Sequence, residues 1–264
     1  MSYLKHLSLN ISTMTIYMLL LLKFILSLKD RKVMVEKQNN IVITSAVRTP
    51  IGTFRGSLKN IQADELGSIV VKEAIKKSNL TSNDVDELIM GQVLTANTGQ
   101  NPARQAAIKA GLPNEKTAYL INQVCGSGLR SVAAGYQSII SKDYNVVIAG
   151  GQESMTNAPH AINIRGGQKL DETNLIDTMI KDGLWDSFNG YHMGVTAENV
   201  AHKWNISRKE QDDFALLSQN KFEKAQREGK FKNEIIPVIL NKEKSNIKFE
   251  NDEHPRSGMT IERL

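Results

Sequence analysis

Short apolar runs alternate with helix-periodic segments through the first part of the chain, and this alternation constrains the fold more than any other feature. Three runs have the length and composition of buried strands, at Leu88 to Leu94, Tyr119 to Val124 and Asn145 to Ala149. Helical segments separate them, at Asn101 to Ala110 and at Leu129 to Ile140. Strands that alternate with helices at this spacing predict a parallel sheet with helices on its faces, which is an α/β fold.

The same pattern predicts further elements around these runs. A strand is expected at Ile41 to Ala46, because β-branched residues there end in the turn Arg48 to Gly52. Asn83, Asp84 and Asp86 stand where a helix would begin. A preceding helix is predicted from the helical spacing of Leu66, Ile69, Val70 and Ala74. In the helix that follows Tyr119 to Val124, apolar residues recur on one side, at Leu129, Val132, Ala133, Tyr136, Ile139 and Ile140.

In the second part of the chain, glycine and aromatic residues are frequent between Met179 and Gly194. Beyond them, Ser207 and Glu210 form a capping box that begins a helix, and Gly229 ends it. Ile235 to Leu240 is predicted to be a strand. From this change of pattern near Ser154 we expect a domain at residues 37–154 and a second at residues 155–264.

Residues 1–36 are expected to be an N-terminal extension outside the fold. The apolar stretch from Thr13 to Leu28 is interrupted by Lys23 and is shorter than the roughly 20 residues of a membrane-spanning helix. Ser27 to Asp30 is a poor signal-peptide cleavage site. A membrane partner is therefore not expected, although an anchor stays an alternative for this segment.

The charge of the chain does not indicate a nucleic-acid partner. The formal net charge is +5, but residues 1–33 carry five basic side chains and one acidic one, which leaves +1 for the remainder. No basic stripe is interleaved with aromatic residues, as nucleic-acid binding would require. The chain has one cysteine, Cys125, so it cannot form an intramolecular disulfide. This is typical of a reducing compartment and favours a cytoplasmic location.

Cys125 is the strongest candidate for chemistry. It lies in the segment Asn122 to Leu129, where a predicted strand leads through small residues into a predicted helix. The unpaired N–H groups and the positive end of the helix dipole favour a thiolate at this position. Gly126 and Gly128 would let a thioester approach backbone N–H donors. A single cysteine is more often a small buried apolar residue, but the Cys-Gly-Ser-Gly turn favours a nucleophile.

The segment NQVCGSGLRSVAAGYQSI around this cysteine resembles the thiolase family. Other segments of the chain carry the same resemblance in family order: TSAVRTPIGTFRGSL, GGQESMTNAPH, GYHMGVTAENVA and RKEQDDFALLSQNK. The resemblance extends from about Ile41 to Leu264. It implies a thiolase-like fold of two similar αβαβα halves, with a loop domain inserted in the first half to hold coenzyme A.

The resemblance also implies roles for individual residues. Cys125 matches the acyl-accepting nucleophile. Leu184, His192 and Met193, in GLWDSFNGYHMG, match residues that line the pantetheine channel and acyl pocket. Arg256, in DEHPRSG, matches an arginine that contacts the nucleotide end of coenzyme A. On composition alone, His192 could be a hydrogen-bonded loop residue, Met193 ordinary core and Arg256 a solvated surface charge.

By resemblance, the expected activity is that of an acetyl-CoA C-acetyltransferase, which condenses two acetyl-CoA to acetoacetyl-CoA or catalyses the reverse thiolysis. Coenzyme A thioesters are then substrates, and neither a cofactor nor a metal is expected. The segment from Asn157 to Gly167 resembles the loop through which these enzymes form tetramers, although a surface loop is the alternative.

The chain departs from the family in its C-terminal motifs. Thiolases use a histidine in a Gly-His-Pro turn as base and a second cysteine in a Cys-x-Gly turn, and neither motif occurs here. His254-Pro255 follows Glu253 and belongs, by context, to the coenzyme A loop. The resemblance therefore implies a first half that stops inside the loop domain and is inactive alone. A longer-chain 3-ketoacyl-CoA thiolase and a non-catalytic thiolase fragment stay open, and β-ketoacyl synthases share the fold.

Overall fold

The computed structural model describes residues 40–165, 175–242 and 245–264. By internal contacts the chain divides into one unit at Met1–Ile41 and another at Val42–Leu264. The extension expected at residues 1–36 lies outside the described residues. None of the helices within the described ranges is long and apolar enough to cross a membrane.

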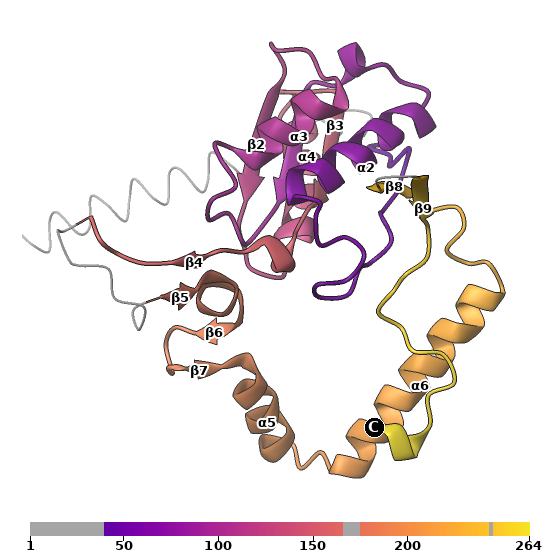
Figure 1. Cartoon of the computed structure of the whole chain (residues 1–264). Coiled ribbons are helices and arrows are strands. Elements are labelled where there is room, and N and C mark those ends of the chain that lie inside the picture. The colour runs from indigo at the N-terminus through magenta and orange to yellow at the C-terminus, as the bar shows by residue number, and fades with distance from the viewer. Residues whose placement is uncertain (1–39, 166–174, 243–244) are drawn as a thin grey trace, which may run out of the picture. The chain divides into compact units, whose positions relative to one another are not determined.

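A three-stranded parallel sheet organises the first part of the unit (Figure 1). Its strand order is β2-β1-β3, and the central strand pairs with both neighbours over its whole length. The carboxyl ends of β1 and β3 lie side by side because Gly91 pairs with Gly151. The strands are β1 Glu87–Gly91, β2 Thr117–Ile121 and β3 Val147–Gly151. The helices around them are α2 Ala63–Lys77, α3 Pro102–Ala110 and α4 Ser127–Ile140. The predicted parallel α/β arrangement is confirmed.

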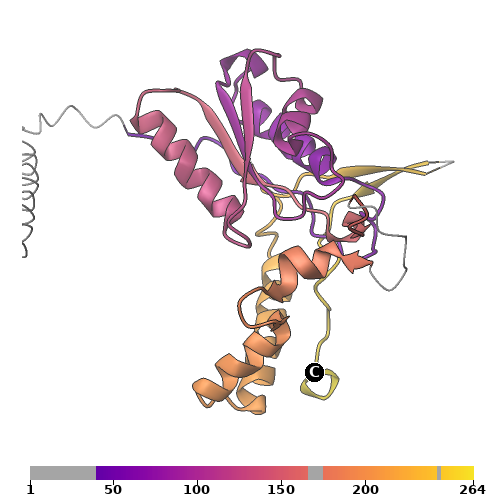
Figure 2. The ribbon, with the colours of Figure 1, turned by 90° about the vertical axis from the view of Figure 1, so that its left-hand side faces the viewer.

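The hydrophobic core lies between the sheet and helices α2 and α3. Leu88 and Met90 of β1 are fully buried there, in one cluster with Val71 of α2 and Ala106 of α3. Figure 2 shows α4 on the opposite face of the sheet. The pleat of β1 sends alternate side chains to the two faces, so this one strand contributes to both layers.

Helix α4 contacts the sheet through small residues. Ser131, Ala134 and Gly135 are buried, and a methyl group on Gly135 would lie 3.1 Å from Val147 Cγ1. The larger apolar side chains form an exposed stripe on α4, at Leu129, Val132, Tyr136 and Ile140. The one-sided apolar pattern was therefore correct, but among the described residues this side faces away from the sheet.

Two predicted elements are wrong. Ile41 to Ala46 forms no strand, and Val42 and Ile43 are 69% and 79% exposed, because no described strand lies beside them. Asn83 to Asp86 begins no α-helix but lies in and after a 3₁₀ turn, Ser82–Asp84. The Asp86 carboxylate instead accepts hydrogen bonds from the N–H groups of Asn145 and Val146, which positions the start of β3.

The second part of the unit contains short hairpins and two longer helices. The capping box of Ser207 and Glu210 begins α6, as predicted. Helix α5 was not predicted. The elements are β4 His160–Ala161, β5 Ile176–Asp177, a π-helical segment Met179–Leu184, β6 Trp185–Asp186, β7 Tyr191–His192, α5 Met193–Lys203, α6 Arg208–Arg227, β8 Val238–Lys242 and β9 Ser245–Phe249. The strand expected at Ile235 to Leu240 is thus β8, which begins later.

Two acidic residues after β9 connect the end of the chain to the segment around Arg48. Arg48 donates two hydrogen bonds to the Asp252 carboxylate, which raises the pKa of the guanidinium. Glu253 accepts hydrogen bonds from the N–H and hydroxyl groups of both Thr53 and Ser57. The N–H of Thr53 and the hydroxyl of Ser57 contribute most to lowering the pKa of Glu253 from 4.5 to about 2.

Candidate active site

Three glycines position Cys125 at the carboxyl end of the sheet. A methyl group on Gly91 would lie 2.4 Å from the carbonyl carbon of Ser127 and 2.5 Å from the nitrogen of Gly128. On Gly151 it would lie 3.5 Å from the Cα of Gly128. The first turn of α4 therefore rests directly on the backbones of β1 and β3, and at Gly91 only glycine permits this approach.

Ser131, one turn further along α4, fixes this contact. Its hydroxyl lies 2.6 Å from the Gly128 carbonyl oxygen and 2.7 Å from that of Gly150 in β3. The side chain is completely buried. A buried hydroxyl with two acceptors holds the helix in one register on the sheet.

The turn before α4 holds its backbone in an unusual conformation. Val124 has a φ of 48°, in the left-handed region that β-branched residues rarely adopt. Three polar groups hold it there: Asn122 Oδ1 accepts from its N–H at 3.0 Å, and the N–H and hydroxyl of Ser127 donate to its carbonyl. The Ser127 hydroxyl also accepts from the N–H of Gln123.

As a result, Cys125 is exposed immediately before Gly126, the N-cap of α4. This is the strand-to-helix junction that the sequence predicted. The N–H groups of Gly126 and Ser127 donate to the carbonyls of Gln123 and Val124, so both are already engaged in the turn.

A pocket of about 440 Å³ opens beside the Cys125 thiol. Cys125 lines it together with Gly91, Gly128 and Gly151. Its other walls come from the segments that follow β1 and β3 and from the π-helical segment. They include the apolar side chains of Val93, Leu94, Met155, Met179 and Leu184. A thiol at the rim of a largely apolar pocket can transfer a group whose chain lies against those walls.

The structure brings together two of the five site residues expected from the sequence. Cys125 and Leu184 line the same pocket, whereas His192, Met193 and Arg256 lie outside its lining. His192 is the N-cap of α5, where its Nδ1 accepts from the Gly194 N–H at 3.0 Å. Met193 is the exposed first residue of α5.

Arg256 lies after β9 and is exposed. Its backbone N–H donates to Gln219 Oε1 of α6 at 3.1 Å. Within the described ranges, no group of three or more metal-ligating side chains occurs.

Three residues of the pocket wall were not predicted. Glu153 lines the pocket, and burial raises the pKa of its carboxyl although backbone N–H groups bond to it. Gln92 and Gln152 are buried and form a side-chain hydrogen bond of 2.9 Å. Gln152 and Glu153 lie in the segment GGQESMTNAPH, which pointed to the family but did not show what these side chains contact.

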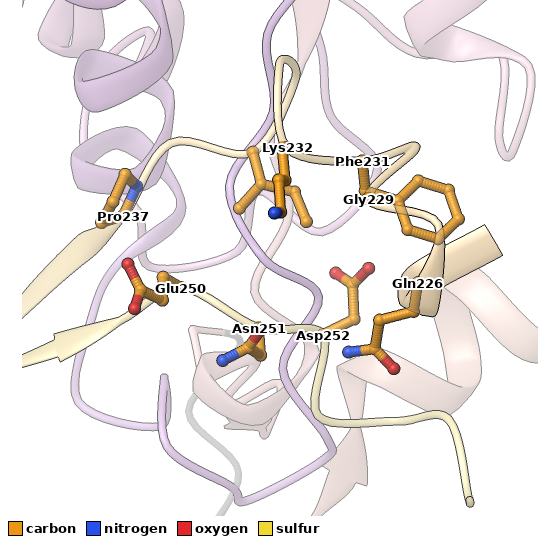
Figure 3. A pocket seen from close by; sticks show the side chains of 9 residues that line it. Gln226, Gly229, Phe231, Lys232, Pro237, Glu250, Asn251 and Asp252 are labelled. Atoms are coloured by element: carbon orange, nitrogen blue, oxygen red, sulfur yellow. The ribbon is translucent and has the colours of Figure 1, made fainter. Parts of the chain in front are cut away.

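A second pocket, of about 320 Å³, is drawn in Figure 3 and shares no lining residue with the pocket beside Cys125. Its lining comes from the end of α6, the segment before β8 and the segment after β9, and includes Asp252. The Asp252 carboxylate is already bonded to Arg48. No cysteine or histidine lines this pocket.

The chain is similar to known proteins over most of its length. Residues 41–264 match the family model described as the thiolase N-terminal domain. An acetyl-CoA acetyltransferase of Paracoccus denitrificans is 56% identical over 223 residues, which are 84% of this chain and 57% of that protein. A cytosolic acetyl-CoA acetyltransferase of Mus musculus is 45% identical over 224 residues, which are 85% of this chain and 56% of that protein.

A solved structure has the same fold. The crystal structure of the Bacillus anthracis acetyl-CoA acetyltransferase matches with a TM-score of 0.81 at 39% identity. The match covers 85% of this chain and 57% of that one. The chain therefore spans somewhat more than half the length of the relatives that it matches.

Proposed function

Because this chain belongs to the thiolase family, we propose that Cys125 accepts an acyl group from a coenzyme A thioester. One observation carries the proposal: the thiol is exposed at the start of α4 and borders an apolar pocket. The thiolate would attack the thioester carbonyl, a bond from Sγ to the acyl carbon would form, and the coenzyme A thiolate would leave. In the family reaction this acyl-cysteine then takes up a carbanion derived from acetyl-CoA.

The proposed overall reaction is that of an acetyl-CoA C-acetyltransferase, with acetyl-CoA and acetoacetyl-CoA as substrates. The curated relatives that match carry this name, which supports the proposal. We further propose that Leu184 contacts the pantetheine arm or the acyl group, since it lines the same pocket as Cys125. For His192, Met193 and Arg256, binding roles in a complete coenzyme A site rest on the motifs alone. Assembly as a tetramer and a cytoplasmic location are likewise proposals.

Binding of the substrate tests the role of Cys125 directly. Since the chain has a single cysteine, iodoacetamide labelling reports on this thiol alone. We expect rapid labelling of the native chain and protection by acetyl-CoA, with slow formation of an acetylated Cys125 peptide detected by mass spectrometry. A Cys125→Ala variant should show neither label nor acetyl group. A thiol that reacts only after denaturation would contradict the assignment.

A longer-chain 3-ketoacyl-CoA thiolase is the second candidate, because the pocket walls are apolar and the volume exceeds what an acetyl group needs. Protection by hexanoyl-CoA at concentrations well below those needed for acetyl-CoA would favour it. If the chain is a non-catalytic fragment, acetyl-CoA should protect Cys125 from iodoacetamide without forming any acetylated Cys125.

A further inference from the structure

Glu153 has no role in the proposed reaction, yet backbone hydrogen bonds hold its carboxylate in the pocket wall beside Cys125. Oε2 accepts from the Val93 N–H at 2.8 Å and Oε1 from the Leu94 N–H at 3.2 Å. Among the described residues it forms no ion pair with a basic side chain. A partly buried carboxylate without a cation is costly, and its bonds to backbone N–H groups compensate for this cost.

Two buried glutamines complete the connection between the segments that follow β1 and β3. Gln152 Nε2 donates to Gln92 Oε1 at 2.9 Å, and Gln92 Nε2 donates to the Leu94 carbonyl at 2.9 Å. The backbone of Leu94 is thus held at its N–H by Glu153 and at its carbonyl by Gln92. Both ends of this peptide segment are therefore fixed relative to β3.

Leu94 in turn contacts the π-helical segment. A methyl group on Gly183 would lie 3.5 Å from Leu94 Cδ2, so the Leu94 side chain packs against this glycine. Met179 and Leu184 of the same segment line the pocket with Leu94. The position of Leu94 therefore determines the position of the apolar pocket wall that it forms with Met179 and Leu184.

We infer that Glu153 is a positioning residue that holds the Val93–Leu94 wall and so sets the affinity of the Cys125 pocket for an alkyl chain. This inference rests on the proposed role of Cys125 as the acyl acceptor. It predicts that removal of the carboxylate changes which ligands fit beside the thiol, while the thiol itself, held by the turn at Asn122 to Ser127, keeps its intrinsic reactivity.

The test compares two thiol reagents that differ only in their alkyl chain, methyl and hexyl methanethiosulfonate. In the unmodified chain the hexyl reagent should label Cys125 faster, because its chain lies against the apolar wall. In Glu153→Ala this preference should fall about tenfold, the size of discrimination that an apolar pocket achieves, while labelling by the methyl reagent is unchanged. Glu153→Gln keeps one acceptor oxygen and should give an intermediate preference.

Glu87→Ala is the matched control. Glu87 is a buried glutamate at the opposite end of β1, and burial raises its pKa as well. This variant should keep the hexyl preference whatever it does to stability. An unchanged preference in Glu153→Ala would overturn the inference; if that variant does not fold, an unchanged preference in Glu153→Gln would overturn it. Neither reagent contains coenzyme A, so a failure of acetyl-CoA protection, which concerns the proposed function, is a separate outcome.

Discussion

Arg48 and Asp252 are 204 positions apart in the sequence and form a two-bond fork, with Nη1 to Oδ1 at 2.7 Å and Nη2 to Oδ2 at 2.9 Å. The Asp252 side chain is 3% exposed and also accepts from the N–H of Ile51 at 2.8 Å. Burial raises the pKa of Asp252, but these hydrogen bonds outweigh it and the net pKa is lowered. The fork therefore keeps the Asp252 carboxylate charged although it is almost fully buried, and it connects distant parts of the chain.

Replacement of Arg48 by Met should destabilise the chain by about 2–3 kcal/mol, somewhat less than a fully buried pair because Arg48 is partly exposed. Arg48→Lys should recover part of the loss, since it keeps the charge but not the fork. Glu234→Gln is the control, because Glu234 bonds to Arg48 from a more exposed position. This substitution should lower the free energy of unfolding by less than ~1 kcal/mol. Urea unfolding followed by circular dichroism measures all three, and equal losses in the three variants would contradict this view of the fork.

Glu253 should make the stability of the chain depend on acid pH. Its folded-state pKa is lowered from 4.5 to about 2, so its stabilising contribution is complete above pH 4.5 and is lost as the pH falls towards 2. Glu253→Gln should therefore be less stable than the unmodified chain at neutral pH, by about 1–2 kcal/mol. Unfolding curves measured from pH 7 to pH 2 should converge at the acid end. A constant gap between the two proteins across this range would refute the assignment.

Gly91→Ala should displace the first turn of α4. Its new methyl group would meet the backbone of Ser127 and Gly128 at 2.4 and 2.5 Å, and backbone cannot move as a side-chain end can. We expect a loss of about 1–3 kcal/mol or more and slower labelling of Cys125. Gly150→Ala is the matched control in the adjacent strand, because its methyl group would meet Met90 Sδ at 3.8 Å, an ordinary contact. Similar labelling rates in the two variants would count against the glycine contact.

The exposed stripe of α4 should make the chain self-associate. Leu129 is 78% exposed, and Tyr136 and Ile140 continue the stripe at helical spacing. Contiguous apolar surface of this kind favours association in water. Leu129→Lys combined with Tyr136→Lys should shift the chain towards monomer in sedimentation velocity, whereas Phe214→Lys, at an exposed position on α6, should not. A chain that is already monomeric at high concentration would refute this prediction.

The chain alone is expected to be almost inactive in acetoacetyl-CoA thiolysis. It contains no Gly-His-Pro or Cys-x-Gly motif, and the loss of general acid–base assistance costs about 10²- to 10⁴-fold per group. A second polypeptide with both motifs, supplied from a full-length relative, should restore turnover. Turnover by the chain alone that disappears in Cys125→Ala would show that an unrecognised base lies within these 264 residues.

The sequence predicted the elements that depend on local pattern and missed the contacts that depend on distant residues. The three parallel strands and the junction at Cys125 followed from apolar runs and small residues, with boundaries shifted by a few positions. The apolar spacing in α4 did not by itself show which side meets the sheet, although the family resemblance predicted an exposed apolar face. The inner side is chosen by Val147 and its neighbours in β3, which require small residues such as Gly135 opposite them. The wall formed by Glu153 was not predictable, since its partners lie about 60 positions earlier in the chain.

The left-handed backbone of Val124 has a consequence for attempts to make this protein more heat-tolerant. A β-branched residue at a φ of 48° raises the energy of the folded state by about 1–3 kcal/mol, and a glycine there would be relieved of that strain. Selection for thermal resistance alone would therefore favour replacing the residue that presents the neighbouring thiol. The hydrogen bonds of Asn122 and Ser127 reach only the backbone of this residue, so a glycine variant keeps them and should present Cys125 in the same place.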